Sequence, residues 1–73
     1  MIELSPREQQ VYALLIQGYG YKKMAAELKI AKRTVYAHIA NMREKAHCTT
    51  NAQLVYKMMM QDIARNDNGA GSG

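Results

Sequence analysis

The sequence predicts an all-α fold of four helices. Apolar residues recur three and four positions apart, which is the period of an α-helix, and two segments begin with a helix-capping pattern. No segment carries the alternating pattern of a strand. We therefore expect one helical domain over residues 1–64. The remaining segment, residues 65–73, has the sequence RNDNGAGSG, which offers no large apolar residue to bury, so we expect a disordered tail there.

Strong start signals mark the first helix. Ser5 can cap the first turn, Pro6 suits the first helical position, and Glu8 completes a capping box of the Ser-x-x-Glu kind. Gly18 is a natural left-handed terminator. Between these signals the apolar residues keep helical spacing, as seen at Val11, Leu14 and Leu15.

A short helix, a three-residue turn and a longer helix follow, over residues 21–28, 29–31 and about 32–46. At about 100° per residue, one side of the longer helix gathers apolar side chains within about 40° of Val35. This side is expected to be buried, and it consists of Val35, Ile39, Met42 and Ala46. The opposite side is expected to face outward, with Arg33, Ala37, Ala40 and Glu44.

The fourth helix begins after Thr49-Thr50, where Thr50 and Gln53 form a second capping box. Its apolar positions are Leu54, Val55, Met58, Met59 and Ile63. Within the run of three methionines, Met58 and Met59 fit the apolar side, whereas Met60 points elsewhere. Core filling explains two of the three. A homodimer or partner surface that includes Val55, Met59 and Met60 would explain the whole run.

The positive charge is concentrated in the middle of the chain. Residues 22–45 hold seven lysines and arginines against two glutamates, whereas the rest holds three basic residues against four acidic ones. The whole net charge of +4 therefore comes from the central third. A localised basic block indicates a polyanionic partner. A merely solvated surface would spread its lysines more evenly.

The outward side of the longer helix is suited to close approach. Ala37 and Ala40 leave a smooth strip, and the bordering Arg33, Tyr36 and Asn41 can hydrogen-bond to bases or phosphates. Together with the short helix and the turn before it, this arrangement matches the helix-turn-helix pattern.

The segments LSPREQQV, KKMAAEL, RTVYAHIANMREK and NAQLV, with Gly18 between the first two, resemble the DNA-binding domain of LuxR/FixJ-type (GerE-like) bacterial transcriptional regulators. The resemblance covers about residues 3–56. It implies a four-helix fold whose third helix enters the DNA major groove and whose fourth often forms a dimer. By position, it implies that bases face Tyr36, Ala37, Ala40 and Asn41. It also implies that phosphates lie near Lys22, Lys23, Lys32, Arg33, Thr34, His38 and Lys45.

This sequence departs from the family pattern at several places. Tyr36, Ala40 and Glu44 stand where basic or longer polar residues are common. Lys29 occupies a turn position where glycine is usual, and Ala46-His47 replaces a usual Leu-Gly pair. Gly20 and Ala31 stand where a serine or similar cap is common, and an alanine cap forfeits about 1 kcal/mol.

The favoured function is a sequence-specific transcriptional regulator that binds double-stranded DNA, acting as a dimer on paired half-sites. The alternative is a helix-turn-helix fold that binds protein, such as an anti-activator of another regulator or a polymerase-binding factor. The missing basic groups at groove-facing positions motivate it, as does the lack of a sensor or receiver domain in this chain. A third interpretation is a sigma-factor-like promoter-binding module, because that module shares the LSPRE start.

Other classes of function lack a signal. His38, His47 and Cys48 offer three candidate metal ligands without a fourth, so no metal or other cofactor is expected. No nucleophile, base and orienting group stand at a recognisable spacing, which argues against an enzyme, and we expect no small-molecule ligand. There is no signal-peptide pattern and no apolar run long enough to span a membrane. The single cysteine fits a reducing compartment, so we expect a cytoplasmic location, in a bacterium or encoded by its phage.

Overall fold

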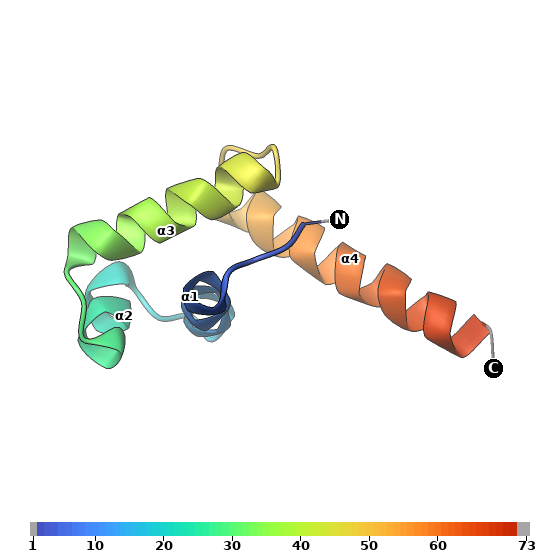
Figure 1. Ribbon diagram of the computed structural model, residues 1–73, viewed down its shortest axis with the longest axis horizontal. Coiled ribbons are helices and arrows are strands. Elements are labelled where there is room, and N and C mark those ends of the chain that lie inside the picture. Colours follow the sequence, from blue (N-terminus) through green and yellow to red (C-terminus); the bar gives the residue numbers. More distant parts are fainter. Residues whose placement is uncertain (1, 72–73) are drawn as a thin grey trace.

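The computed structural model describes the backbone of residues 2–71 and the side chains of residues 2–64. It contains four helices: α1 (Pro6–Ile16), α2 (Tyr21–Leu28), α3 (Lys32–Lys45) and α4 (Asn51–Gly71). In Figure 1, α3 lies across α1 and α2, while α4 packs against the C-terminal half of α3 and extends beyond the other helices. The described chain has no strand, so the all-α, four-helix prediction is confirmed.

Both predicted capping boxes form. At the start of α1, the Glu8 amide donates to Ser5 Oγ at 3.2 Å, and the Ser5 amide donates to Glu8 Oε1 at 2.8 Å. At the start of α4, the Gln53 amide donates to Thr50 Oγ1 at 3.1 Å and the Thr50 amide to Gln53 Oε1 at 3.3 Å. These bonds satisfy backbone groups that have no partner inside the helix, and so fix where each helix begins.

The two central helices begin differently. Gly20 precedes α2 and Ala31 precedes α3, and neither supplies a side-chain cap. Two residues other than glycine adopt left-handed backbone within the described chain, Lys29 with φ 56° after α2 and His47 with φ 55° after α3. A side chain in this region costs roughly 1 kcal/mol or more, because its Cβ crowds the following carbonyl oxygen. The connections on both sides of α3 are therefore strained.

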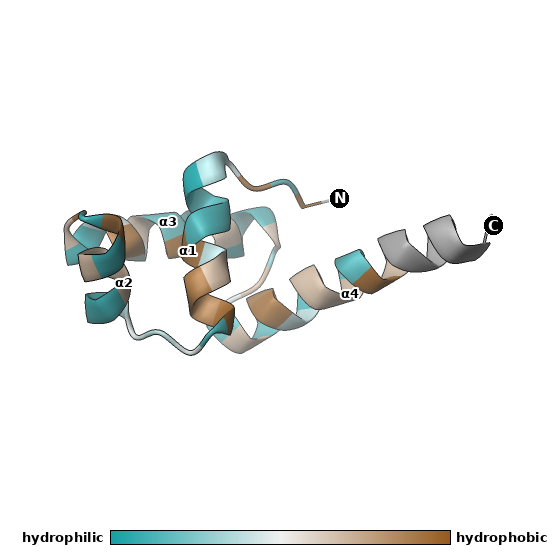
Figure 2. Ribbon diagram, turned by 90° about the horizontal axis from the view of Figure 1, so that it is seen from below, coloured by the Kyte–Doolittle hydropathy of each residue, from teal (hydrophilic) through white to brown (hydrophobic). Residues whose placement is uncertain are grey.

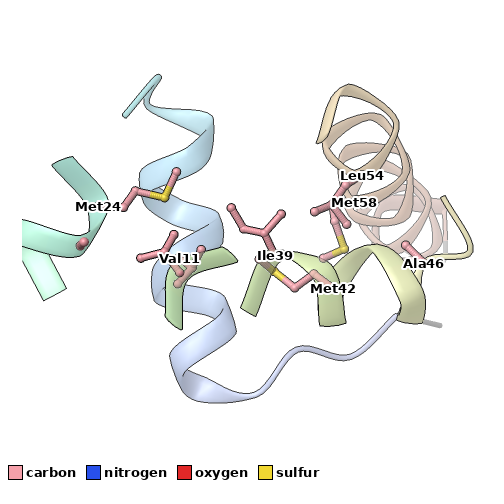
Figure 3. Packing of buried hydrophobic residues seen from close by; sticks show 9 residues of the cluster. Val11, Met24, Ile39, Met42, Ala46, Leu54 and Met58 are labelled. Carbon is pink, nitrogen blue, oxygen red and sulfur yellow. The ribbon is translucent and has the colours of Figure 1, made fainter. Parts of the chain in front are cut away.

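One hydrophobic core joins all four helices (Figure 3). Its nine buried residues are Val11, Met24, Ala25, Val35, Ile39, Met42, Ala46, Leu54 and Met58. The predicted inner side of the longer helix is confirmed, because all four of its residues belong to this core. Because the buried side of α3 packs in this core, the orientation of the helix is fixed and its opposite side is exposed to solvent.

The methionine run of α4 is divided between the core and the surface. Apolar residues recur along the described part of this helix (Figure 2), but only Met58 of the three methionines is buried. Met59 is 48% exposed and Met60 45% exposed, and Tyr56 and Ile63 are exposed as well. Core filling therefore explains Met58 alone, because α4 packs against the other helices along a narrower stripe than its apolar residues cover.

The predicted disordered tail, residues 65–73, falls largely outside the described residues. The bounds of α4 include residues 65–71, but their side chains are not described, and residues 72–73 are not described at all. Among the described residues, no helix combines the length and the hydropathy that crossing a membrane would require.

Candidate nucleic-acid interface

The outward side of α3 is open to solvent. Ala37, Ala40 and Asn41 are exposed, and Tyr36 keeps 48% of its surface exposed. Arg33 is exposed near the N-terminal end of the same helix. The structure therefore brings the four residues predicted to face bases onto one accessible surface, in the order that the helical period implies.

Tyr36 is held by two neighbours. Its ring meets the ring of Tyr21 edge to face, with centroids 4.6 Å apart and planes at 83°. Lys32 Nζ lies 5.9 Å from the centroid of the Tyr36 ring. The Tyr21 hydroxyl in turn accepts a hydrogen bond from Asn51 Nδ2, at the first residue of α4. Tyr36 is thus tied through Tyr21 to both α2 and α4.

Tyr21 is a site residue that the sequence analysis missed. It belongs to the start of α2, and its partners lie 15 and 30 positions along the chain. The chain offered one signal, an aromatic residue at the first position of a short helix, where a small or polar residue would suffice. That signal does not say which residue the ring would meet.

Basic side chains surround the start of both central helices. Those exposed to solvent are Lys22, Lys23, Lys29, Lys32 and Arg33. None of them forms an ion pair with another described residue. Lys23 Nζ lies 4.4 Å from the centre of the Tyr19 ring, which keeps its stem against the protein while its charge stays accessible. The predicted Thr34 and His38 are half-buried.

The two uncapped helix starts coincide with this charge. The first turn of α2 carries Lys22 and Lys23, and the first turn of α3 carries Lys32 and Arg33. The first backbone amides of a helix have no partner within the helix, and the helix dipole places partial positive charge there. In α3 the Thr34 amide donates to the backbone oxygen of Ala31 at 2.9 Å. Without a side-chain cap, the amides that precede it can donate to an anion. Each start thus combines free donors with two cations.

The C-terminal end of α3 is arranged differently. Lys45 Nζ lies 2.6 Å from Glu8 Oε1, and it also donates to the backbone oxygen of Glu3 at 3.4 Å. Arg43 Nη1 donates to the backbone oxygen of Thr49 at 3.2 Å. The structure therefore directs the charge of Lys45, which the resemblance places near phosphate, toward α1. Lys45 does not join the cations at the other end of α3.

Glu8 is the anchor of this end. Burial alone would raise the pKa of its carboxyl, but hydrogen bonds from Lys45 and the Ser5 amide, together with the charge of Lys45, hold that pKa below its usual value of 4.5. The Glu8 carboxylate thus remains ionised and caps α1 while it binds α3. Beside it lies an open hollow of about 530 Å³, lined by Glu8, Asn41, Glu44, Lys45 and His47.

Within the described chain, no group of three or more histidine, cysteine, aspartate or glutamate side chains is placed to hold a metal ion. Cys48 is half-buried against the core, and its thiol is not in a disulfide.

A short helix, a three-residue turn and a longer helix with a smooth exposed side define a helix-turn-helix domain of the kind that binds nucleic acid. Residues 3–60 match the family model GerE, described as "Bacterial regulatory proteins, luxR family". The chain therefore belongs to the luxR family of bacterial regulatory proteins, and the resemblance seen in the sequence is confirmed.

Two relatives illustrate this membership. The chain is 40% identical over 55 residues to a protein from Salmonella typhimurium (strain LT2) named transcriptional regulatory protein UhpA. It is equally similar, over the same length, to the UhpA protein of Escherichia coli (strain K12). Each alignment covers 75% of this chain and 28% of the relative, so the chain spans little more than a quarter of the length of these proteins. No solved structure matches the chain.

Proposed function

We propose that this chain is a sequence-specific DNA-binding domain of a transcriptional regulator, with α3 inserted in the major groove of double-stranded DNA. The observation that carries the proposal is the exposed side of α3, where short side chains are bordered by hydrogen-bonding groups and preceded by accessible cations. Membership in the luxR family supports it, as do relatives named as transcriptional regulatory proteins.

Phosphate contacts would come from the starts of α2 and α3. The side chains proposed for them are Lys22, Lys23, Lys32 and Arg33, with Lys29 in the turn between the helices. Thr34 and His38, half-buried at the edge of the interface, would add weaker hydrogen bonds. Lys45 would support the interface indirectly by fixing α3 on α1 through Glu8. Base contacts would come from Tyr36, Ala37, Ala40 and Asn41.

We further propose that the domain works as a homodimer on paired half-sites, in the bacterial cytoplasm. The exposed Met59 and Met60 on α4, with the partly buried Val55, support an interface there. Flexible methionines adapt to an apolar partner surface. Two copies joined in this way would present two α3 helices to one duplex.

A selection of bound duplexes from a random pool tests the proposal, followed by titration of the selected duplex over a range of salt concentrations. If about five phosphates are neutralised, log K should fall against log salt with a slope of roughly −4 to −5. An enriched sequence motif with this slope would support the proposal. Failure to bind any duplex at low salt would overturn it.

Two observations favour a second function. The outward side of α3 ends in Glu44, and the exposed apolar side chains of α4 would suit a protein partner. The domain could thus bind another regulator or the polymerase without reading DNA. The same titration separates the two functions, because a protein-binding module would show no duplex preference and no steep dependence on salt.

A further inference from the structure

The middle of the exposed side of α3 is apolar. Ala37 and Ala40 expose methyl groups, and the ring of Tyr36 stands next to them on the same helix. Alanine side chains neither donate nor accept hydrogen bonds. The cations lie toward the start of the helix, at Lys32 and Arg33, and not in this strip. The base-reading surface therefore has a small apolar patch, defined here as Tyr36, Ala37 and Ala40.

This patch selects among the four bases on chemical grounds. In the major groove, guanine presents two acceptors and cytosine presents an amino donor, whereas thymine presents a 5-methyl group, the apolar group on a base edge. Alanine methyls placed against guanine or cytosine would remove polar groups from water without replacing their hydrogen bonds, which is unfavourable. Against thymine, the same methyls bury an apolar group. The apolar patch therefore fits thymine.

Asn41 extends this preference. It follows Ala40 directly, it is exposed, and its side-chain amide forms no hydrogen bond with another described residue. An asparagine amide can donate to N7 and accept from N6 of adenine at the same time, which is the pairing its geometry favours in the major groove. An unengaged asparagine next to the apolar patch thus points to an adenine next to the thymines.

We propose that the half-site read by this domain has a core of A·T pairs, in which thymine methyl groups pack against Tyr36, Ala37 and Ala40 and an adenine pairs with Asn41. This inference rests on the proposed function and names the class of DNA that the site selects. It assigns to Tyr36 the role of a specificity-determining residue.

Tyr21 is the positioning residue for Tyr36. The edge-to-face contact at 4.6 Å fixes the Tyr36 ring before DNA arrives, and Asn51 fixes Tyr21 through its hydroxyl. A tyrosine has two rotatable side-chain bonds, so a neighbour that restricts them reduces the entropy lost on binding. Loss of the Tyr21 ring would leave Tyr36 present but less ordered, and would weaken the methyl contact selectively.

The test uses the duplex obtained by selection and replaces each thymine, one at a time, by deoxyuridine, which lacks only the 5-methyl group. For the unchanged chain, binding should weaken about 3- to 5-fold at one or more core positions, as expected for one buried methyl. In Tyr36→Ala, the effect at one of these positions should fall below about 2-fold. In Asn41→Ala, the preference for one A·T pair should relax.

Variants of Tyr21 separate positioning from folding. Tyr21→Leu should reduce the deoxyuridine effect at the Tyr36 position, whereas Tyr21→Phe, which keeps the ring edge and loses only the hydrogen bond from Asn51, should retain most of it. Binding to a duplex of unrelated sequence and the midpoint of thermal unfolding serve as controls, because a general loss of structure would change both. Equal deoxyuridine effects in Tyr21→Leu and in the unchanged chain would overturn the positioning role.

Two results would overturn the wider inference while leaving the proposed function in place. One is a selected motif whose core consists of G·C pairs, and the other is a motif that binds equally well with every thymine replaced. Absence of sequence-specific binding to any duplex would be a different failure, because it would remove the proposed function together with this inference.

Discussion

At the N-terminal end of α3, Lys32 and Arg33 extend into solvent, whereas at its C-terminal end Lys45 and Arg43 bind oxygen atoms of the protein itself. Lysine and arginine occur at both ends, so the residue type does not distinguish them. What differs is whether a carboxylate lies close to the basic side chains. Glu8 reaches the C-terminal end from α1, and no described carboxylate pairs with the cations of the N-terminal end.

This contrast changes how the basic block should be interpreted. The sequence assigns a net charge of +5 to residues 22–45, but part of that charge holds α3 in place. Only cations that remain accessible can displace counterions from DNA. The charge available to a polyanion is therefore smaller than the count suggests, and it is concentrated where α2 and α3 begin.

The largest effect should come from Glu8→Ala. This change removes half of the α1 capping box and the partner of Lys45, so the free energy of unfolding should fall by about 2–3 kcal/mol. Lys32→Ala, at the other end of α3, should change it by less than about 0.5 kcal/mol. Urea denaturation followed by circular dichroism measures both. Equal losses in the two variants would mean that the ends of α3 do not differ as described.

For DNA binding, a change at the N-terminal end of α3 should have a larger effect than a change at its C-terminal end. Lys32→Ala should lower affinity about 5- to 10-fold and reduce the magnitude of the salt slope by about 0.9, because one phosphate contact is lost. Lys45→Ala should leave the slope unchanged, since its charge faces Glu8. Titrations of one duplex at several salt concentrations provide the measurement. A reduced slope in Lys45→Ala would show that this lysine leaves Glu8 to meet phosphate.

The Glu8 contact should also make stability depend on pH. The pKa of Glu8 is lower in the folded chain than its usual value of 4.5, so its contribution is present above that value and is lost as the pH falls below it. Near neutral pH, the free energy of unfolding of the unchanged chain should exceed that of Glu8→Gln by about 1 kcal/mol. This difference should shrink in acid. Unfolding curves of both chains over this range provide the test. A constant difference would contradict the assignment.

The smallest effects concern the left-handed residues that flank α3. Lys29→Gly and His47→Gly should each raise the free energy of unfolding by about 0.5–1 kcal/mol, because glycine adopts this backbone without strain. Only Lys29→Gly removes a cation from the proposed DNA side, so it alone should weaken DNA binding. Thermal unfolding and the duplex titration together separate the two results. Loss of stability in His47→Gly would show that its side chain has an unrecognised contact.

The fold could largely be predicted because its determinants are local. Ser5, Glu8, Thr50 and Gln53 cap helices through residues three positions away, and the inner side of α3 follows from the helical period alone. The left-handed backbone at Lys29 also agrees with its place in a turn where glycine is usual. Such features need no knowledge of how the helices pack.

The site was less predictable because its contacts join separate helices. The pairing of Tyr21 with Tyr36 and of Glu8 with Lys45 depends on how α1 and α2 cross α3, which no local pattern specifies. The same limit explains why helical spacing alone left Met59 open between the core and the surface, since the width of the buried stripe on α4 is set by its neighbours. The helical period identifies the side of a helix, and tertiary packing determines which of its charges stay accessible.

The core has a chemical consequence beyond recognition. The chain has no phenylalanine or tryptophan, and the thioethers of Met24, Met42 and Met58 fill the space between the helices. Among the methionines of residues 2–64, Met59 and Met60 are the exposed ones, so while the domain is folded peroxide reaches them before it reaches the three in the core. Mild oxidation would therefore alter the surface of α4 while the fold persists. Oxidation of the core methionines would require the helices to separate. The polar oxygen of the sulfoxide would then disfavour their packing together again.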